Sequence, residues 1–345
     1  MPAMRDLRTD ISRVEERVAA SSGSDRAPVF SVIVPVHNKA RHVEAALRSV
    51  LNQSFRGFEI IVVDDASTDG SREIVESIAT PLVRLLGREA PGPGGYAARN
   101  LGTSVAIGDW ITFLDADDEW SPDRLERLRA AIQRFPEVNL HACAWHVATR
   151  DGRRRPNKYS RMHESRGPHL VTLKQYLSSL RRNRPIIHTD TVAIRRSALP
   201  DAAVFPADVG LRRGGDGYAW LRLMCRERSL VWSPDVGASY FVDSDNMVTR
   251  TVKVDVDAFA RPLVMALEGG LTAPERRWLR QAANGLLWHN WVNEVLQGRP
   301  GFGLRQHLFW RGAWAQALVM ALGSTFPPGL IRGLRRLASS ARGSS

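Results

Sequence analysis

The feature that most constrains the fold is the alternation of short apolar runs with helical segments in the first part of the chain. The runs are rich in β-branched residues, as in strands buried on both faces of a parallel sheet, and lie at 29–36, 58–63, 81–86 and 109–114. Segments with helical spacing follow them at 43–51, 71–78, 94–107 and 121–134. This order predicts an α/β fold with a Rossmann-type, mostly parallel sheet flanked by helices.

Two of these helices also carry start signals. Asp69 is expected to cap the helix at 71–78, and Ser121 with Pro122 is expected to begin the helix at 121–134. After residue 138 the pattern loosens. We expect strands at 138–148, 186–194 and 237–242, a helix at 216–226, and a basic, mobile loop at 150–169.

These segments suggest three parts. A short amphipathic helix at 5–19 and a linker fill residues 1–28. A catalytic domain covers 29–250, divided near residue 118 into a nucleotide-binding half (29–118) and an acceptor-binding half (119–250). A basic helical region covers 251–345.

Cysteine content and apolar runs narrow the class of protein. Cys143 and Cys225 are the two cysteines in 345 residues, too few for a disulfide scaffold or a four-thiolate zinc site, so we expect a reducing compartment. The first twenty residues lack the apolar run of a signal peptide, and no run of about 18 apolar residues predicts a membrane span. A cytoplasmic protein is the expectation.

Polar residues follow three of the predicted parallel strands, and the carboxyl ends of such strands form the usual ligand crevice. They are Pro35 to Asn38, Asp64 to Ser67, and Asp115 to Asp118. The acids in the last segment repel one another unless a cation or a proton neutralises them. Their carboxylate oxygens are hard ligands that suit Mg²⁺ or Mn²⁺, and such a cation commonly binds a diphosphate substrate as well. The alternative is that these acids only form turns and cap helices.

Other nucleotide-binding signatures are missing. No phosphate-binding loop with a glycine–lysine–serine or –threonine ending occurs. The glycine-rich stretch from Gly92 to Gly95 lacks dinucleotide spacing, although its N–H groups and Arg99 suit a phosphate. A plain loop and a surface arginine are the alternative.

Taken in order, six segments resemble the family 2 glycosyltransferases, which have the GT-A fold. The segments are VIVPVHN at 32–38, VVDDASTDGS at 62–71, AARNLG at 97–102, GDWITFLDADDEWSPDRL at 108–125, HTDTVAIRRSAL at 188–199 and GGDGYAWLRL at 214–223. The resemblance covers about residues 29–245. It implies an inverting enzyme that uses a nucleotide sugar, usually a uridine diphosphate sugar, with a metal ion.

The resemblance also implies roles for individual residues. Asp115 and Asp117 match the family's D-x-D pair, with Asp117 the more direct ligand of Mn²⁺ or Mg²⁺, and Asp216 matches the general base. The alternative for Asp216 is a helix N-cap. The residues expected to bind the nucleotide sugar are Pro35, Val36, His37, Asn38, Asp65, Arg99, Asp115 and Ala116.

Several positions depart from the family pattern. His37 replaces a commoner tyrosine, and Gly215 replaces the glutamate often found before the base. Residues 240–243 lack the usual arginine and histidine, which leaves one side of the diphosphate site unassigned. The Q-x-x-R-W signature of processive synthases is missing as well. Transfer of one sugar per encounter to a saccharide or lipid-linked acceptor is therefore expected.

Basic charge is concentrated at the carboxyl end of a chain with net charge +12. Residues 299–345 hold seven arginines and no acid. Leu330, Ile331, Leu334 and Leu337 share one helical face, with arginines largely off it. Such a helix suits an anionic membrane, here the cytoplasmic face of the inner membrane; packing against the catalytic domain or a second subunit is the alternative.

Two other functions fit parts of the sequence. The acid cluster by itself also suits a nucleotidyltransferase or a phosphatase, although a phosphatase calls for threonine or valine where Asp118 and Glu119 stand. The basic charge suits a nucleic-acid-binding protein, but no nucleic-acid module occurs, so nucleic acid is not an expected partner.

Overall fold

One mixed sheet organises the part of the chain that the computed structural model describes. That part comprises residues 28–78, 80–199, 203–209, 211, 213–245, 261–298, 303–327, 329 and 331. The strands are β1 Phe30–Val36, β2 Phe58–Asp64, β3 Val83–Gly87, β4 Trp110–Phe113, β5 Glu119–Trp120, β6 Leu140–Ala148, β7 Arg154–Pro156, β8 His169–Thr172, β9 Ala193–Arg195 and β10 Ser229–Phe241. Within the described residues their order is β3-β2-β1-β4-β9-β6-β10-β5, with β7 beside β6 and β8 beside β10.

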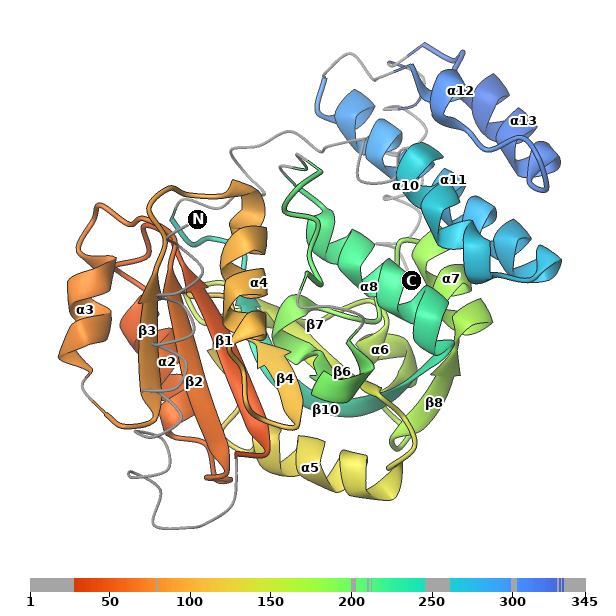
Figure 1. Ribbon diagram of the computed structural model, residues 1–345. Helices are drawn as coiled ribbons and strands as arrows, with labels where there is room; N and C mark the ends of the chain where they lie inside the picture. Colours follow the sequence, from red (N-terminus) through yellow and green to blue (C-terminus); the bar gives the residue numbers. More distant parts are fainter. Residues whose placement is uncertain are drawn as a thin grey trace, which may run out of the picture.

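The first four strands form a parallel unit. β1 pairs with β2 on one side and with β4 on the other, and β3 extends the sheet beyond β2. The connecting helices α2 (Val43–Leu51), α3 (Ser71–Ser77) and α4 (Tyr96–Ser104) lie on both faces of the sheet (Figure 1). The carboxyl ends of β1, β2 and β4 therefore reach the same edge.

Alternating side chains of β1 enter two separate cores because successive residues of a strand point to opposite faces. Val32 and Val34 pack in one core with Leu47 of α2, whereas Ile33 belongs to the core on the α4 side. α4 approaches β1 closely: a Cβ on Gly102 would lie 2.6 Å from the Ile33 Cγ2 atom. Glycine at this position lets α4 and its side chains sit directly on the sheet.

The second half of the sheet is largely antiparallel. β9 runs antiparallel to both β4 and β6, and β10 runs parallel to β6 but antiparallel to β5 and β8. Its helices are α5 (Arg124–Arg134), α6 (Ser160–His163), α7 (Leu173–Arg181) and α8 (Gly215–Glu227). α7 begins with a capping box between Thr172 and Gln175.

The carboxyl-terminal helices extend the molecule beyond α7 and α8 (Figure 1). They are α10 (Arg261–Ala266), α11 (Ala273–Leu296), α12 (Leu304–His307) and α13 (Trp314–Gly323). Leu287, Trp291 and Val295 of α11 form a small third core with α12 and α13. Among the described residues, every helix is too short or too polar to cross a bilayer.

The α/β class and the parallel first half are confirmed. The expected strand at 186–194 is wrong for most of its length, because residues 189–191 form a 3₁₀ turn before β9. The region 150–169 contains β7 and α6, and the strand expected at 237–242 begins at Ser229.

The two helix starts differ in detail from the expectation. α5 begins at Arg124, and Ser121 does not cap this helix. The hydroxyl of Ser121 instead donates to the Val236 carbonyl at 2.7 Å. The N-cap position of α3 is Gly70, although the Asp69 carboxylate accepts from the Ser71 N–H at 3.0 Å. The predicted helix at 5–19, and all of the face at 330–337 except Ile331, lie outside the described residues. The division into parts stays a prediction.

Candidate functional site

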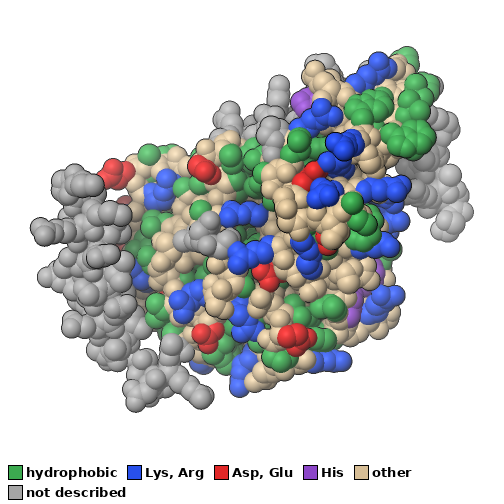
Figure 2. Space-filling model, turned by 45° about the vertical axis from the view of Figure 1, so that its right-hand side comes forward, with side chains coloured by type: hydrophobic (Ala, Val, Ile, Leu, Met, Phe, Trp, Pro, Cys, Tyr) green, Lys and Arg blue, Asp and Glu red, His purple; other side chains and the backbone are tan. Residues whose placement is uncertain are grey.

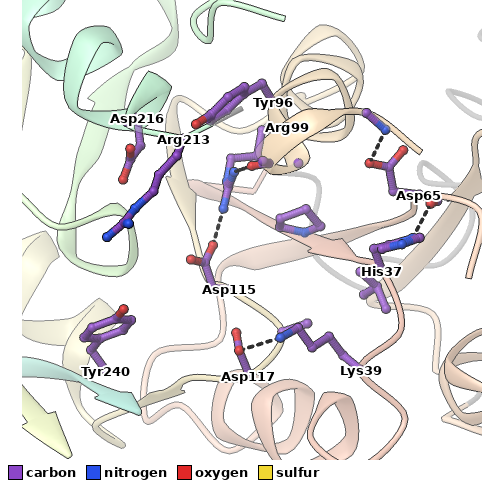
Figure 3. A pocket seen from close by; sticks show the side chains of 17 residues that line it. His37, Lys39, Asp65, Tyr96, Arg99, Asp115, Asp117, Arg213, Asp216 and Tyr240 are labelled. Carbon is purple, nitrogen blue, oxygen red and sulfur yellow. Dashed lines mark hydrogen bonds and ion pairs between the residues drawn. The ribbon is translucent and has the colours of Figure 1, made fainter. Parts of the chain in front are cut away.

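An open cleft of about 240 Å³ lies where β1, β2 and β4 end and where α8 begins (Figure 3). Nine of the ten residues predicted for the site line this cleft. They are Pro35, Val36, His37, Asp65, Arg99, Asp115, Ala116, Asp117 and Asp216. The convergence follows from the parallel strands, which deliver their following loops to one edge.

Asn38 is the predicted site residue that does not line the cleft. Its backbone has φ of 53°, a left-handed conformation that asparagine tolerates. Its side-chain oxygen accepts from the Thr68 N–H at 2.8 Å, and its own N–H donates to the Ser67 hydroxyl at 3.1 Å. Asn38 thus ties the loop after β1 to the loop after β2.

Asp65 is buried at the end of β2, where its two carboxylate oxygens have different partners. One oxygen pairs with the guanidinium of Arg88, and the other accepts from the Gly92 N–H at 3.0 Å. The Asp65 carbonyl accepts from His37 Nδ1 at 2.7 Å. Asp65 therefore joins the glycine-rich loop to the ring of His37 at one end of the cleft (Figure 3).

Arg99 of α4 pairs with Asp115 in the middle of the cleft. Burial by itself lowers the pKa of Arg99, but the Asp115 carboxylate outweighs burial, so the pKa of Arg99 is raised. Burial raises the pKa of Asp115 despite this partner, and the negative charge of Asp190 adds to the increase. The guanidinium also donates to the Gly94 carbonyl at 2.8 Å, which links the acids to the glycine-rich loop.

Asp117 forms an ion pair with a lysine side chain. The Lys39 ammonium lies 2.7 Å from Asp117 Oδ2 and also donates to the Asp245 carbonyl at 2.7 Å. The Lys39 and Asp117 side chains are 12% and 13% exposed, so their pair faces the cleft with little water around it. Arg150 holds the same loop from the other side, because its guanidinium donates to the Asp117 carbonyl at 2.6 Å and to Glu119 at 2.8 Å.

A buried network supports the acids from behind. Asp190 accepts from the Asp115 N–H at 2.8 Å and lies 2.9 Å from His188 Nδ1, while Asp118 accepts from the Phe241 N–H at 2.7 Å. Burial, with the charge of Asp190 next, raises the pKa of Asp118 well above its usual range. Burial also opposes ionisation of Asp190, but the charge of His188 and the hydrogen bonds to Asp190 together lower its pKa. The two carboxyl groups of this network therefore shift in opposite directions.

The carboxylates of the cleft fit a divalent cation. Asp115 and Asp117 offer hard oxygen donors of the kind that Mg²⁺ and Mn²⁺ prefer, and Asp117 already attracts an ammonium. Asp115, Asp118 and Asp190 also place one oxygen each within 4.8 Å of one another. Because Asp118 and Asp190 are buried outside the cleft lining, and Asp190 already lies beside His188, the open pair Asp115 and Asp117 is the better cation site.

Asp216 enters the cleft from the first turn of α8, opposite the acids that follow β4 (Figure 3). Its proposed alternative role as an N-cap is wrong, because Gly214, with φ of 86°, occupies that position. The Gly215 N–H donates to the Tyr96 hydroxyl at 2.8 Å. Burial, and then the charge of Asp216, raises the pKa of Tyr96 to about 12, so this hydroxyl remains protonated.

The sequence interpretation gave no role to several residues at the site. Lys39, Tyr96, Arg213 and Tyr240 line the cleft. The ring of His188 contacts those of Trp145 and Tyr240 in tilted geometry, at ring-centroid distances of 5.3 and 4.7 Å. His188 and Asp190 stand inside the HTDTVAIRRSAL segment, so that motif carried a usable signal. Lys39 follows directly after VIVPVHN, but nothing in the local sequence names Asp117 as its partner.

Comparisons with known proteins agree with this geometry. Residues 31–201 match the model of Glycosyl transferase family 2. A Haemophilus influenzae protein described as an uncharacterized glycosyltransferase is 43% identical over 101 residues, which are 29% of this chain and 40% of that protein. The succinoglycan biosynthesis protein ExoO of Rhizobium meliloti is 41% identical over 105 residues, 30% of each chain. The matched stretch thus spans less than half the length of these relatives.

Solved structures show the same fold. Staphylococcus aureus TarS in complex with UDP-GlcNAc superposes with a TM-score of 0.63 at 19% identity, over 90% of this chain and 92% of that one. The mannosyltransferase PcManGT of Pyrobaculum calidifontis, in complex with GDP-Man and Mn²⁺, superposes with a TM-score of 0.54 at 21% identity. The superposition covers 96% of this chain and 87% of that one. The family match favours glycosyl transfer over the nucleotidyltransferase and phosphatase alternatives. Residues 31–201 of the chain form a family 2 glycosyltransferase domain.

Proposed function

We propose that this protein transfers a sugar from a nucleoside diphosphate sugar to a hydroxyl group of a saccharide or lipid-linked acceptor, with inversion at the anomeric carbon. The observation that carries the proposal is that the acids after β4 and Asp216 of α8 line one cleft from opposite sides. The relatives described as acting in succinoglycan, amylovoran and teichuronic acid biosynthesis support polysaccharide synthesis as the setting.

The donor side of the cleft suits a nucleoside diphosphate. Arg99, Arg213 and Lys39 bring positive charge to it, and Gly94 and Gly95 leave backbone uncovered beside Arg99. UDP is our preferred nucleotide because the TarS neighbour was solved with UDP and with UDP-GlcNAc. Mn²⁺ or Mg²⁺ held by Asp115 and Asp117 supplies, when bound, positive charge that stabilises the departing diphosphate.

The acceptor side requires a base, and Asp216 is the carboxylate placed to serve. As the acceptor oxygen bonds to the anomeric carbon, its proton passes to the Asp216 carboxylate, and the bond from the anomeric carbon to the diphosphate oxygen breaks. Arg99 and Arg213 line the cleft, where their guanidinium groups can balance the negative charge that grows on the leaving group. One displacement inverts the centre and forms no covalent sugar–enzyme intermediate.

The test is a screen of nucleotide sugars for nucleoside diphosphate release, with Mn²⁺, with Mg²⁺ and with a chelator. We expect one donor class to be turned over in a metal-dependent manner and Asp117→Asn to abolish that turnover. Asp123→Asn, which removes a carboxylate outside the cleft, is the matched control and should retain it. Turnover by Asp117→Asn equal to that of the wild type would refute the assignment.

A further inference from the structure

The outer face of α13 is apolar although it is exposed. The helix reads WAQALVMALG and contains no charged residue. Ala317 and Ala321 are buried in the third core, so that side of the helix already has a partner. The outer side exposes large apolar side chains, which we call the α13 face. The α13 face comprises Trp314, Leu318, Val319, Leu322 and Phe326, exposed by 67, 44, 70, 57 and 52%.

The concentration of these side chains is unusual for the molecule. Of the ten large apolar side chains that are exposed in the described residues, six lie between Trp310 and Phe326. Figure 2 shows apolar side chains gathered at the upper right end of the molecule, with Lys and Arg side chains beside them. A helix that is apolar on all sides is normally buried, so this face is built to be covered.

The positive charge near the α13 face indicates what kind of partner binds there. Arg305 of α12 and Arg311 of the connection between α12 and α13 are exposed. Along the sequence, residues 299–345, which include α13, hold seven arginines and no acid. A second copy would bring the same positive charge against itself, which is unfavourable. An anionic surface gains from both the charge and the apolar side chains.

We propose that the α13 face docks on the interface of an anionic membrane. Tryptophan prefers the headgroup level, and an apolar stripe flanked by arginine inserts its apolar side chains below it while the guanidinium groups contact lipid phosphates. Trp314 and Trp310 sit at the amino-terminal end of this stripe, next to Arg311. The inference rests on α12 and α13 and is independent of the proposed transfer reaction. It uses residues other than those of the predicted face at 330–337.

Vesicle co-sedimentation of the full chain tests the proposal. Wild-type protein should pellet with vesicles of equal parts phosphatidylcholine and phosphatidylglycerol, and far less with phosphatidylcholine alone or at high salt. Leu318→Glu/Leu322→Glu should lower the partition coefficient at least about tenfold. The matched control Met162→Glu/Leu170→Glu replaces two exposed apolar residues elsewhere and should bind as the wild type does.

Further measurements distinguish membrane binding from misfolding and from self-association. Arg311→Gln leaves the apolar face and the bond from Arg305 to the Ala321 carbonyl of α13 intact, and it should weaken binding to anionic vesicles severalfold. Diphosphate release without vesicles should be unchanged in all variants, which keeps this test apart from that of the proposed function. Equal sedimentation of wild type and Leu318→Glu/Leu322→Glu would overturn the proposal. So would a wild-type dimer in light scattering that the same pair of substitutions dissociates.

Discussion

The hydroxyl of Tyr96 connects the two halves of the cleft, and removing it tests that connection. Tyr96 begins α4 beside the glycine-rich loop, and its hydroxyl accepts the N–H of Gly215, the residue before Asp216. The ring is 3% exposed and stacks on Phe205 with an interplanar angle of 7°. Tyr96→Phe keeps this packing and deletes one acceptor.

The size of the effect follows from the buried N–H that loses its partner. A buried donor left unsatisfied costs about 1–3 kcal/mol, so the free energy of unfolding should fall by that amount. Because Gly215 starts the helix that carries Asp216, part of this energy should appear as a misplaced base. A loss of about 1.4 kcal/mol in the chemical step corresponds to about tenfold in kcat.

Two assays check this prediction. Denaturant unfolding gives the stability change, and steady-state diphosphate release with saturating donor gives kcat and KM. Tyr159→Phe removes a hydroxyl from another buried tyrosine that does not line the cleft, so it should leave kcat unchanged. If Tyr96→Phe unfolds at the wild-type denaturant concentration and keeps wild-type kcat, the bond to Gly215 does not position α8.

Three other substitutions probe the site and the core. Asp216→Asn should lower kcat by at least about a hundredfold while donor affinity, measured by calorimetry, changes little; a normal rate would move the base elsewhere. Lys39→Gln should tighten Mn²⁺ binding severalfold by titration, because it removes the ammonium that competes for Asp117; weaker binding would contradict this. Burial lowers the pKa of His141 to about 4 against 6.5 in the unfolded chain, so the free energy of unfolding should fall by about 3 kcal/mol as the pH drops from 6.5 to 4. His141→Phe should flatten that slope in pH-dependent unfolding, and an unchanged slope would show that other groups cause it.

The regular first half of the fold was predictable because its residues follow one rule. Val43, Ala46, Leu47 and Val50 repeat at helical spacing and face one core, and α2 has the predicted bounds Val43–Leu51. The strands β1 and β2 are buried on both faces, so a short apolar run, Val32–Val36 or Ile60–Val63, identifies each of them.

The second half departs from local rules because tertiary contacts override them. The run 186–194 contains strand-forming residues, but Asp190 turns inward to accept the Asp115 N–H, and this interrupts the strand. β10 continues past Pro234 through shifts in its register with β6 between Ser233 and Ala238, so the sequence pattern breaks where the strand does not. The capping box from Thr172 to Gln175, in contrast, is a local sequence signal for the start of α7.

The site was predictable in its acids and not in their partners. Acids that follow parallel strands meet for topological reasons, so Asp65, Asp115 and Asp117 converge whatever their neighbours are. The partner of Asp117 is Lys39, which lies 78 residues away along the chain. No periodicity links residues at that separation, and only the register of β1 beside β4 brings them together.

The charges of the cleft explain why a diphosphate and a cation should enter together. Asp65 is paired with Arg88, Asp115 with Arg99 and Asp117 with Lys39, so the charges are balanced before any ligand arrives. A cation alone would have to displace the Lys39 ammonium from Asp117 and leave two positive charges side by side, which is unfavourable at a site this sheltered. A diphosphate that arrives with the cation gives the displaced ammonium a new partner. We therefore expect the cation and the diphosphate to bind together, and the affinity for the metal to depend on the nucleotide.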